Sequence, residues 1–401
     1  MFSHLTAYAG DPILGLMQKH DEDLRGDKVN LGVGVYYDDD GRLPVLESVK
    51  QAEERIANPI KPRPYLPMDG LPGYRAACQR LLFGKDAQVI KDGRVATVAT
   101  IGGSGALKVG ADFIHAWFPE AKCYVSDPTW GNHIGIFEGS GFEVGKYPYY
   151  DPATNGVRID DMLAFLDKLN PNDVVLLHPC CHNPTGVDLT REQWDQVLDV
   201  IKNKRLLAFM DIAYQGFGED MDADAYAIRR AAELGLSFFV SNSFSKNLSL
   251  YGERVGGLSV VCQDAAQAKL VHGQLKYTIR RIYSSPASHG GHVVDIVMND
   301  DALFEQWVSE VYVMRDRIRA MRAQLREALE QKIAGRSFEY LTKQNGMFSF
   351  TGLTPEQVQR LQDDFAVYMV GNGRMCVAGL NSRNIDYIAN AMAAVLANDN
   401  A

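Results

Sequence analysis

The sequence predicts an α/β protein whose larger part is a mainly parallel β-sheet covered by helices on both faces. Between residues 95 and 261, short apolar runs alternate with longer segments of helical periodicity, which is the pattern of parallel strands joined by crossover helices. Polar residues directly follow several of these runs. From residue 301 the pattern changes to one long amphipathic helix and a mixed segment, which predicts a second, smaller α+β domain.

Composition excludes several classes of function. The chain has 401 residues, of which 46% are hydrophobic and 23% charged, as in globular proteins with a sizeable core. A net charge of −9 argues against nucleic acid or an anionic membrane as a partner. We also expect no membrane span and no secretory signal. Six cysteines make no disulfide framework in a chain this long, which favours the cytoplasm.

The N-terminal region begins with an expected arm, residues 1–12, that has no core of its own. Residues 29–37 form a strand-like stretch containing Gly32 and Gly34. Glycines in a strand let another molecule approach the backbone, or they mark a bulge. Both interpretations stay open for these two residues.

A helix is expected over residues 47–56, followed by a proline-rich stretch over residues 59–72. Proline excludes a helix or a central strand here, so the stretch is a stiff loop. Such loops often carry functional residues. Tyr65 lies in it, although a single loop tyrosine is usually a packing residue.

The first strand-helix unit carries a glycine-rich segment. We expect a strand over residues 95–101, a turn over residues 102–105 and a helix over residues 106–117. A glycine-rich turn that opens a helix is a phosphate site in principle, because free amides and the helix dipole point at the anion. The segment is neither a Walker sequence nor G-x-G-x-x-G, so the signal is weak by itself.

Five further strands continue the alternation. They are expected at residues 122–125, 174–177, 206–210, 235–240 and 257–261. Between two of them, Thr190 with Gln193 three residues later has the pattern of a capping box at the start of a helix. The long helix from Asp301 should run for roughly thirty residues, and residues 338–396 form the smaller α+β unit.

Polar groups recur at the carboxyl ends of these strands, where ligands bind in open α/β sheets. The segments concerned are Ser126–Trp130, His178–Pro184, Asp211–Tyr214 and Ser243–Lys246. Lys246 at such a place can lose water and become a nucleophilic amine, the chemistry needed for an imine with a substrate carbonyl or with pyridoxal phosphate (PLP). The alternative for Lys246 alone is the start of a surface loop.

The other groups suit a phosphorylated pyridine aldehyde. Ser104, Gly105, Ser243 and Arg254 can bind its phosphate. For the ring, Trp130 offers a stacking face, Asp211 can hold the proton on the ring nitrogen, and Asn183 and Tyr214 can bind the ring hydroxyl. Each residue also has a structural alternative as core, cap or turn. Cys180-Cys181-His182 lacks the further spaced ligands that zinc needs, and we expect no metal.

The sequence resembles the class I, aspartate-aminotransferase-like PLP enzymes, and within them the bacterial aromatic-amino-acid (tyrosine) aminotransferases. The resemblance covers nearly the whole chain. Its motifs are Ser126-Asp-Pro-Thr-Trp130, His178-Pro-Cys-Cys-His-Asn183-Pro-Thr-Gly186, Asp211-x-Ala-Tyr214-Gln-Gly-Phe217, Ser243-Phe-Ser-Lys246-Asn247, Tyr251-Gly-Glu-Arg254-Val-Gly-Gly257, Arg280-x-x-Tyr283-Ser284, Gln344-Asn-Gly-Met-Phe348 and Gly373-Arg374-x-x-Val-Ala-Gly379.

The resemblance implies a seven-stranded sheet in a large PLP domain, residues 46–313. The small domain would combine residues 13–45 with 314–401, and the arm 1–12 would lie on the partner subunit of a homodimer. Asp127-Pro128 and Asn183-Pro184 would be cis, which is inexpensive only before proline.

The resemblance also assigns the site. Lys246, Asp211 and Tyr65 would be catalytic, and the cofactor residues would be Gly103, Ser104, Gly105, Trp130, Asn183, Asp211, Tyr214, Ser243, Lys246, Arg254 and Tyr65. The substrate would be bound by Gly34, Trp130, Asn183, Arg280 and Arg374. Tyr65 and Arg280 would come from the neighbouring chain, so the active sites would be shared across the dimer interface.

The implied reaction is transamination of tyrosine, phenylalanine and tryptophan, and also of aspartate, with 2-oxoglutarate as acceptor, in ping-pong fashion through a Lys246 imine. The alternative is an aspartate aminotransferase with minor aromatic activity, because Arg280 suits a side-chain carboxylate. Pro64 and Ala287 depart from the family pattern near the substrate entrance. A non-catalytic PLP or nucleotide-anion binder would not need Lys246, Arg280 and Arg374 together. A PLP lyase or decarboxylase would be expected to lack a clamp for a second dicarboxylate, so Arg280 argues against it.

Overall fold

The computed structural model describes residues 1–7, 10–60 and 62–397 and divides into two compact units. The larger unit is residues 44–316, and the smaller unit combines residues 1–43 with 317–401. The sequence placed these boundaries at 45/46 and 313/314. The expected arm, residues 1–12, lies partly outside the described residues, and its contact with a partner stays a prediction.

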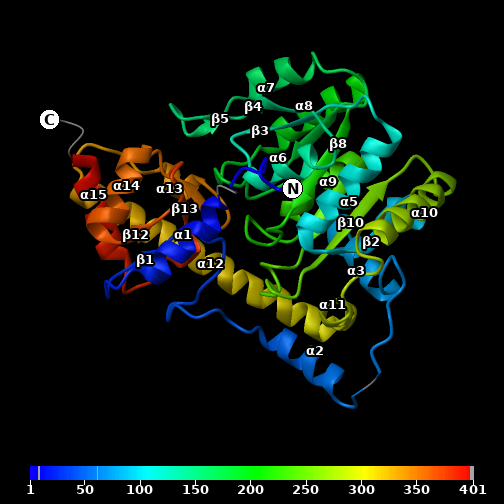
Figure 1. Ribbon diagram of the computed structural model, residues 1–401, viewed down its shortest axis with the longest axis horizontal. Helices are drawn as coiled ribbons and strands as arrows, with labels where there is room; N and C mark the ends of the chain where they lie inside the picture. Colours follow the sequence, from blue (N-terminus) through cyan, green and yellow to red (C-terminus); the bar gives the residue numbers. More distant parts are fainter. Residues whose placement is uncertain (8–9, 61, 398–401) are drawn as a thin grey trace. The chain divides into compact units, whose positions relative to one another are not determined.

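The larger unit is built on a seven-stranded sheet with the order β2-β10-β9-β8-β7-β3-β4 (Figure 1). The strands are β2 (Val95–Ile101), β3 (Cys123–Asp127), β4 (Val144–Pro148), β7 (Val174–Leu177), β8 (Leu207–Ile212), β9 (Phe238–Ser243) and β10 (Val255–Val261). Only β10 runs antiparallel to its neighbours in this sheet. The predicted mainly parallel, seven-stranded α/β fold is therefore confirmed.

Helices cover both faces of this sheet. Gly257 of β10 lies beside Cys78, whereas the next residue, Leu258, lies beside Gly110, and successive strand residues point to opposite faces. Cys78 belongs to α3 (Pro72–Phe83) and Gly110 to α5 (Gly102–Trp117). The other helices are α2 (Glu47–Ala57), α4 (Gln88–Lys91), α6 (Gly131–Glu138), α7 (Ile159–Leu166), α8 (Arg191–Lys204), α9 (Tyr226–Glu233), α10 (Ala265–Ile282), α11 (His289–Asn299) and α12 (Asp301–Lys332).

Several expected elements are confirmed in detail. Thr190 caps α8 with Gln193 in a capping box, and the long helix from Asp301 is α12, with 32 residues. Asp127-Pro128 and Asn183-Pro184 are cis. Among the described residues of the 59–72 stretch there is no helix or strand before Pro72. Within the described part of the chain, no helix is long and apolar enough to cross a membrane.

Two expected elements were wrong. Gly102–Gly105 is the first turn of α5 and not a separate turn before it, so its free amides belong to the helix end itself. The strand-like stretch 29–37 is reduced to β1 (Val29–Asn30). The Asn30 side chain accepts hydrogen bonds from the Gly32 and Val33 amides, which turns the chain away from the ladder.

Three strands are displaced toward their carboxyl ends, and one of them is the strand expected at residues 206–210, which is β8 (Leu207–Ile212). The strand expected at residues 235–240 is β9, which continues through Ser243 because these small polar residues are buried and paired with β10. Gly235 has φ of +75° and lies before the strand. The strand expected at residues 122–125 is β3, which reaches Asp127.

The smaller unit is a mixed α+β structure, as predicted. β1 pairs in parallel with β12 (Val367–Tyr368), and β11 (Phe348–Phe350) pairs antiparallel with β13 (Arg374–Cys376). Around these ladders lie α1 (Pro12–Glu22), α13 (Tyr340–Lys343), α14 (Pro355–Phe365) and α15 (Ile385–Ala397).

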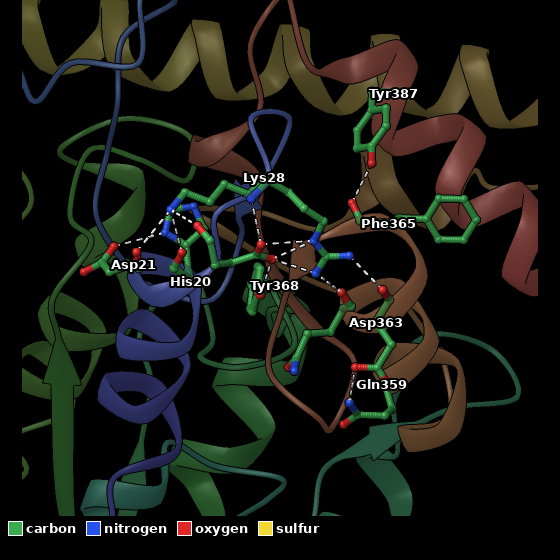
Figure 2. Close-up of polar contacts among 11 residues, drawn as sticks. His20, Asp21, Lys28, Gln359, Asp363, Phe365, Tyr368 and Tyr387 are labelled. Atoms are coloured by element: carbon green, nitrogen blue, oxygen red, sulfur yellow. Dashed lines mark hydrogen bonds and ion pairs between the residues drawn. The ribbon is translucent and has the colours of Figure 1, made fainter.

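Two cations hold helix ends in this unit (Figure 2). Nζ of Lys28 donates to the carbonyls of His20, Asp21 and Asp23 at 2.7–3.3 Å, at the carboxyl end of α1. Arg25 donates to the carbonyls of residues 362 and 363 at the end of α14. Positive groups satisfy the last carbonyls and the negative end of the helix dipole.

Replacing Lys28 with methionine should lower the midpoint of thermal unfolding, because the last carbonyls of α1 lose their donor. Loss of hydrogen bonds from a charged group costs about 1.5–3 kcal/mol. Lys19→Met is the matched control, since Lys19 is an exposed lysine in the same last helical turn. Equal midpoints for the two variants would show that Lys28 does not cap α1.

Candidate active site

The polar segments of the larger unit meet at one edge of the sheet. β3, β7, β8 and β9 are parallel neighbours, so their carboxyl ends lie together. β2 runs in the same direction, because β10 is antiparallel to both β2 and β9. The start of α5 and the start of β10 therefore belong to this edge as well.

One end of this edge gathers hydrogen-bond donors and positive charge. α5 begins directly after β2, and among the described residues no side chain caps its first amides. Arg254 lies against this helix start, since a Cβ placed on Gly102 would be 2.5 Å from its Nη2. Ser243 lies beside Gly103, since a Cβ placed on Gly103 would be 3.4 Å from Cβ of Ser243 and 3.9 Å from its hydroxyl. A positive helix end, a guanidinium and a hydroxyl together suit a phosphate group.

The positions of the predicted phosphate residues follow from this helix. Gly103, Ser104 and Gly105 all lie in the first turn of α5. The Ser243 hydroxyl is 3.1 Å from that of Ser245, and Arg254 donates to the Tyr251 carbonyl at 3.0 Å. These bonds fix the hydroxyl and the guanidinium beside the helix end.

Asp211 is buried in β8 and contacts a histidine that sequence reasoning missed. Its Oδ2 lies 3.1 Å from Nε2 of the fully buried His133, and Nδ1 of His133 lies 2.9 Å from the Thr129 hydroxyl. Burial alone would raise the pKa of Asp211, but the hydrogen bond from His133 and the nearby imidazoles outweigh it, and the pKa is lowered. Asp211 is thus kept as a carboxylate.

Two further histidines, His178 and His182, are buried next to His133. The His178 ring lies 5.0 Å from His133 and 4.4 Å from His182, and His182 stacks on Tyr149 at 4.1 Å. Burial lowers the pKa of His178 to about 3, and the proximity of His133 adds to this. His178 is therefore neutral. Two of the three histidines had a signal in the sequence, since His178 directly follows β7 and His182 lies in the same loop, whereas His133 lies within α6.

Lys246 follows β9 and is half-buried. Its Nζ lies 5.2 Å from the centre of the Tyr214 ring. The turn that carries it is fixed by the Phe244 amide, which donates to the Val255 carbonyl, and by the Trp307 indole, which donates to the Asn247 carbonyl at 2.7 Å. The amine is thus held at the sheet edge and partly removed from water.

The carboxylates of the half-buried Asp188 and the buried Asp224 anchor the two loops beside it. Asp188 accepts from the amides of Cys181 and His182 at 2.9 and 2.8 Å, which fixes the loop of the buried Asn183. Asp224 accepts from the amides of residues 216, 218 and 219, which fixes the loop after Tyr214. Burial raises the pKa of Asp224 to about 6, against the effect of these amides.

Trp130 precedes α6 and is half-buried, with its ring 5.1 Å from that of His133 in an edge-on arrangement.

Within the described chain, no contact links Tyr65 or Arg280 to the other predicted site residues. Tyr65 is 96% exposed, and the exposed Arg280 donates to the Ser284 hydroxyl within α10 and its cap. That the two residues serve a neighbouring subunit's site stays a prediction.

Arg374 is buried in the smaller unit, which holds it from two sides. Its Nη2 donates to the Gly32 carbonyl at 2.6 Å, and its Cζ lies 4.3 Å from the centre of the Phe348 ring. Gly34 is close to the same ring, because a Cβ there would be 2.8 Å from Phe348 Cζ. The buried Arg322, which sequence reasoning missed, donates to the carbonyls of residues 341, 346 and 348 and so fixes Phe348.

Two groups of described residues bring possible metal ligands within 4.8 Å of one another. In the first, Asp211 and His133 are hydrogen-bonded to each other. The second is Cys180, Cys181 and Asp224, and the Asp224 oxygens accept three amides. His182 of the Cys-Cys-His run instead contacts the hydroxyls of Ser126 and Thr185. Asp211, Asp224 and His182 therefore already have hydrogen-bond partners within the protein.

Comparison with known proteins agrees with this arrangement. Residues 26–392 match the family model described as aminotransferase class I and II. The aromatic-amino-acid aminotransferase of Escherichia coli is 57% identical over 99% of this chain and 100% of its own length, and the aspartate aminotransferase of Pseudomonas aeruginosa is 48% identical over the same shares.

Solved structures extend the match to the fold. A psychrophilic aromatic amino acid aminotransferase from Psychrobacter sp. B6, crystallised with aspartic acid, is 72% identical with a TM-score of 0.97, covering 99% of this chain and 100% of that one. The aromatic-amino-acid aminotransferase of Burkholderia pseudomallei, covalently bound to pyridoxal phosphate, is 52% identical with a TM-score of 0.97 and 99% coverage of both chains. The chain belongs to the class I and II aminotransferases.

Proposed function

We propose that this protein is a PLP-dependent aminotransferase that moves the amino group of tyrosine, phenylalanine and tryptophan, and also of aspartate, to 2-oxoglutarate. The observation that carries the proposal is the position of Lys246. Its amine is held at the same sheet edge as the anion site at the start of α5 and the buried Asp211. Relatives named for aromatic and for aspartate substrates support both substrate classes.

The residues present fit PLP. The start of α5 leaves no room for a side chain at Gly102, because a Cβ there would be 2.5 Å from Nη2 of Arg254, as expected of a close phosphate site. Asp211, kept charged by its hydrogen bond to His133, can hold a proton on a pyridine nitrogen. When bound, the cofactor supplies an electron sink for the carbanion formed at the substrate α-carbon.

The protein's own groups then act on the substrate. The Lys246 amine would bind the cofactor covalently, and as a free amine it would carry the substrate α-proton as general base and acid. Asn183 and Tyr214 would donate to the ring oxygen, and Trp130 would cover the ring. Tyr65 completes the cofactor set from the partner chain.

Substrate carboxylates require cations. We propose Arg374 for the α-carboxylate, supported by its burial and its fixed position on Phe348, with Asn183 and the backbone near Gly34 assisting. Arg280 would bind a side-chain carboxylate. The exposure of Tyr65 and Arg280 supports a homodimer with shared active sites, onto which residues 1–12 would pack. All six cysteines are free and buried, in keeping with the cytoplasm.

A second candidate function is aspartate transamination with minor aromatic activity, which the presence of Arg280 favours. The kcat/KM values for aspartate, tyrosine, phenylalanine and leucine with 2-oxoglutarate decide between the two. A larger value for tyrosine or phenylalanine than for aspartate supports the first. No turnover with any of them would leave only a binding protein.

Arg280→Ala should lower kcat/KM for aspartate far more than for phenylalanine, because only aspartate loses a charge-assisted hydrogen bond. A contribution of about 1.5–3 kcal/mol corresponds to roughly 10- to 150-fold. Arg281→Ala is the control, since the neighbouring Arg281 lies over the Tyr277 ring at 4.7 Å. Equal losses for the two substrates would contradict the role of Arg280.

A further inference from the structure

We propose that Ser284 is a positioning residue that holds the Arg280 guanidinium when the substrate side chain carries no carboxylate. Ser284 would thereby set the balance between acidic and aromatic substrates. The proposal rests on the role proposed for Arg280 above, and it adds a residue that itself touches neither substrate nor cofactor.

The position of Ser284 is fixed by the end of α10. The helix ends at Ile282, and the amides of Tyr283 and Ser284 both donate to the Ile279 carbonyl at 3.0 Å. Ser284 has φ of +70°, a left-handed conformation that closes many helices and is usually taken by glycine or asparagine. Serine is less stable than glycine in this backbone conformation. We therefore infer that the serine side chain has a role at this position.

The Ser284 hydroxyl accepts a hydrogen bond from Nη1 of Arg280, four residues earlier. Residues at this spacing lie on the same side of a helix. The backbone bonds of the helix end hold the hydroxyl in place whatever the arginine does, whereas the exposed Arg280 side chain is long and can rotate. The next residue, Arg281, instead lies over Tyr277, so the two adjacent arginines have different partners.

The Ser284 hydroxyl accepts a hydrogen bond from Arg280 weakly enough for that bond to be reversible. An arginine facing an aromatic side chain without an acceptor would be left unpaired, which costs free energy. A hydroxyl provides a neutral acceptor. A substrate carboxylate adds the attraction between opposite charges and can be bidentate, so it displaces the hydroxyl. An acidic residue at position 284 would compete with the substrate instead.

A series of substitutions at this position tests the proposal. Ser284→Gly removes the acceptor and suits the left-handed backbone, and it should lower kcat/KM for phenylalanine about three- to tenfold while that for aspartate stays within about twofold. Ser284→Asp should lower the value for aspartate at least about tenfold through an ion pair with Arg280, and spare phenylalanine. Ser284→Asn, which keeps both an acceptor and the backbone preference, should retain the wild-type ratio.

The same substitutions in an Arg280→Ala background separate the two proposals. There, Ser284→Gly and Ser284→Asp should no longer change the aspartate-to-phenylalanine ratio. A change that persists without Arg280 shows a purely structural role for Ser284. If Arg280→Ala alone fails to discriminate the substrates, the function proposed for Arg280 is wrong. If Arg280→Ala affects aspartate and phenylalanine differently but the Ser284 substitutions do not, only the positioning role of Ser284 is wrong.

Discussion

Lys246→Ala is expected to abolish both the covalent attachment of PLP and nearly all turnover. The amine provides the bond to the cofactor and the general base for the α-proton, and general acid–base catalysis alone contributes about 10²- to 10⁴-fold. We therefore expect the visible absorbance of the bound cofactor to disappear and kcat with tyrosine to fall by at least about 10⁴-fold. Absorbance spectroscopy and steady-state rates measure the two effects separately.

Lys202→Ala is the matched control, because Lys202 is an exposed lysine in the last turn of α8. It should keep the wild-type spectrum and rate. A Lys246→Ala enzyme that turned over at a comparable rate would remove Lys246 from the mechanism, even if the fold and the cofactor site were intact.

Asp211→Asn should cause the second largest loss. The substitution keeps the size of the side chain but removes its negative charge, which lies 3.1 Å from Nε2 of His133. In the proposed function, this charge holds the proton on the pyridine nitrogen. Loss of one fixed electrostatic partner of a reacting group costs about 10²- to 10³-fold in kcat. PLP should also bind more weakly, as measured by titration of the apoenzyme.

Asp199→Asn provides the comparison, since Asp199 is exposed on α8 and its neutralisation changes the net charge equally. Asp211→Glu keeps the charge and should recover part of the lost rate. Wild-type kcat in Asp211→Asn would show that the ring proton does not depend on this carboxylate.

Much of the fold could be predicted because its signals are local. Apolar runs of strand length, the Thr190 capping box and the three-and-four spacing of α12 each depend on a few neighbouring residues. Polar residues after strands also pointed to a single site, since parallel strands bring their carboxyl ends to one edge.

Most of the remaining features depend on tertiary contacts. The helix start at Gly102 depends on space beside Arg254. The shortening of β1 is an exception, because it follows from local hydrogen bonds to the side chain of Asn30. His133 contacts Asp211 from 78 residues earlier, and the carbonyls held by Arg322 lie on a distant loop. No local pattern encodes such pairs, so sequence reasoning passed over them.

The most direct test of the lysine's role is to locate the covalent bond. Holoenzyme treated with borohydride, which reduces the link between PLP and an amine, can be digested and its labelled peptide identified by mass spectrometry. The reduced cofactor should be found on Lys246 in one equivalent per chain. Labelling of a different lysine, or of none in an active preparation, would contradict the proposed function.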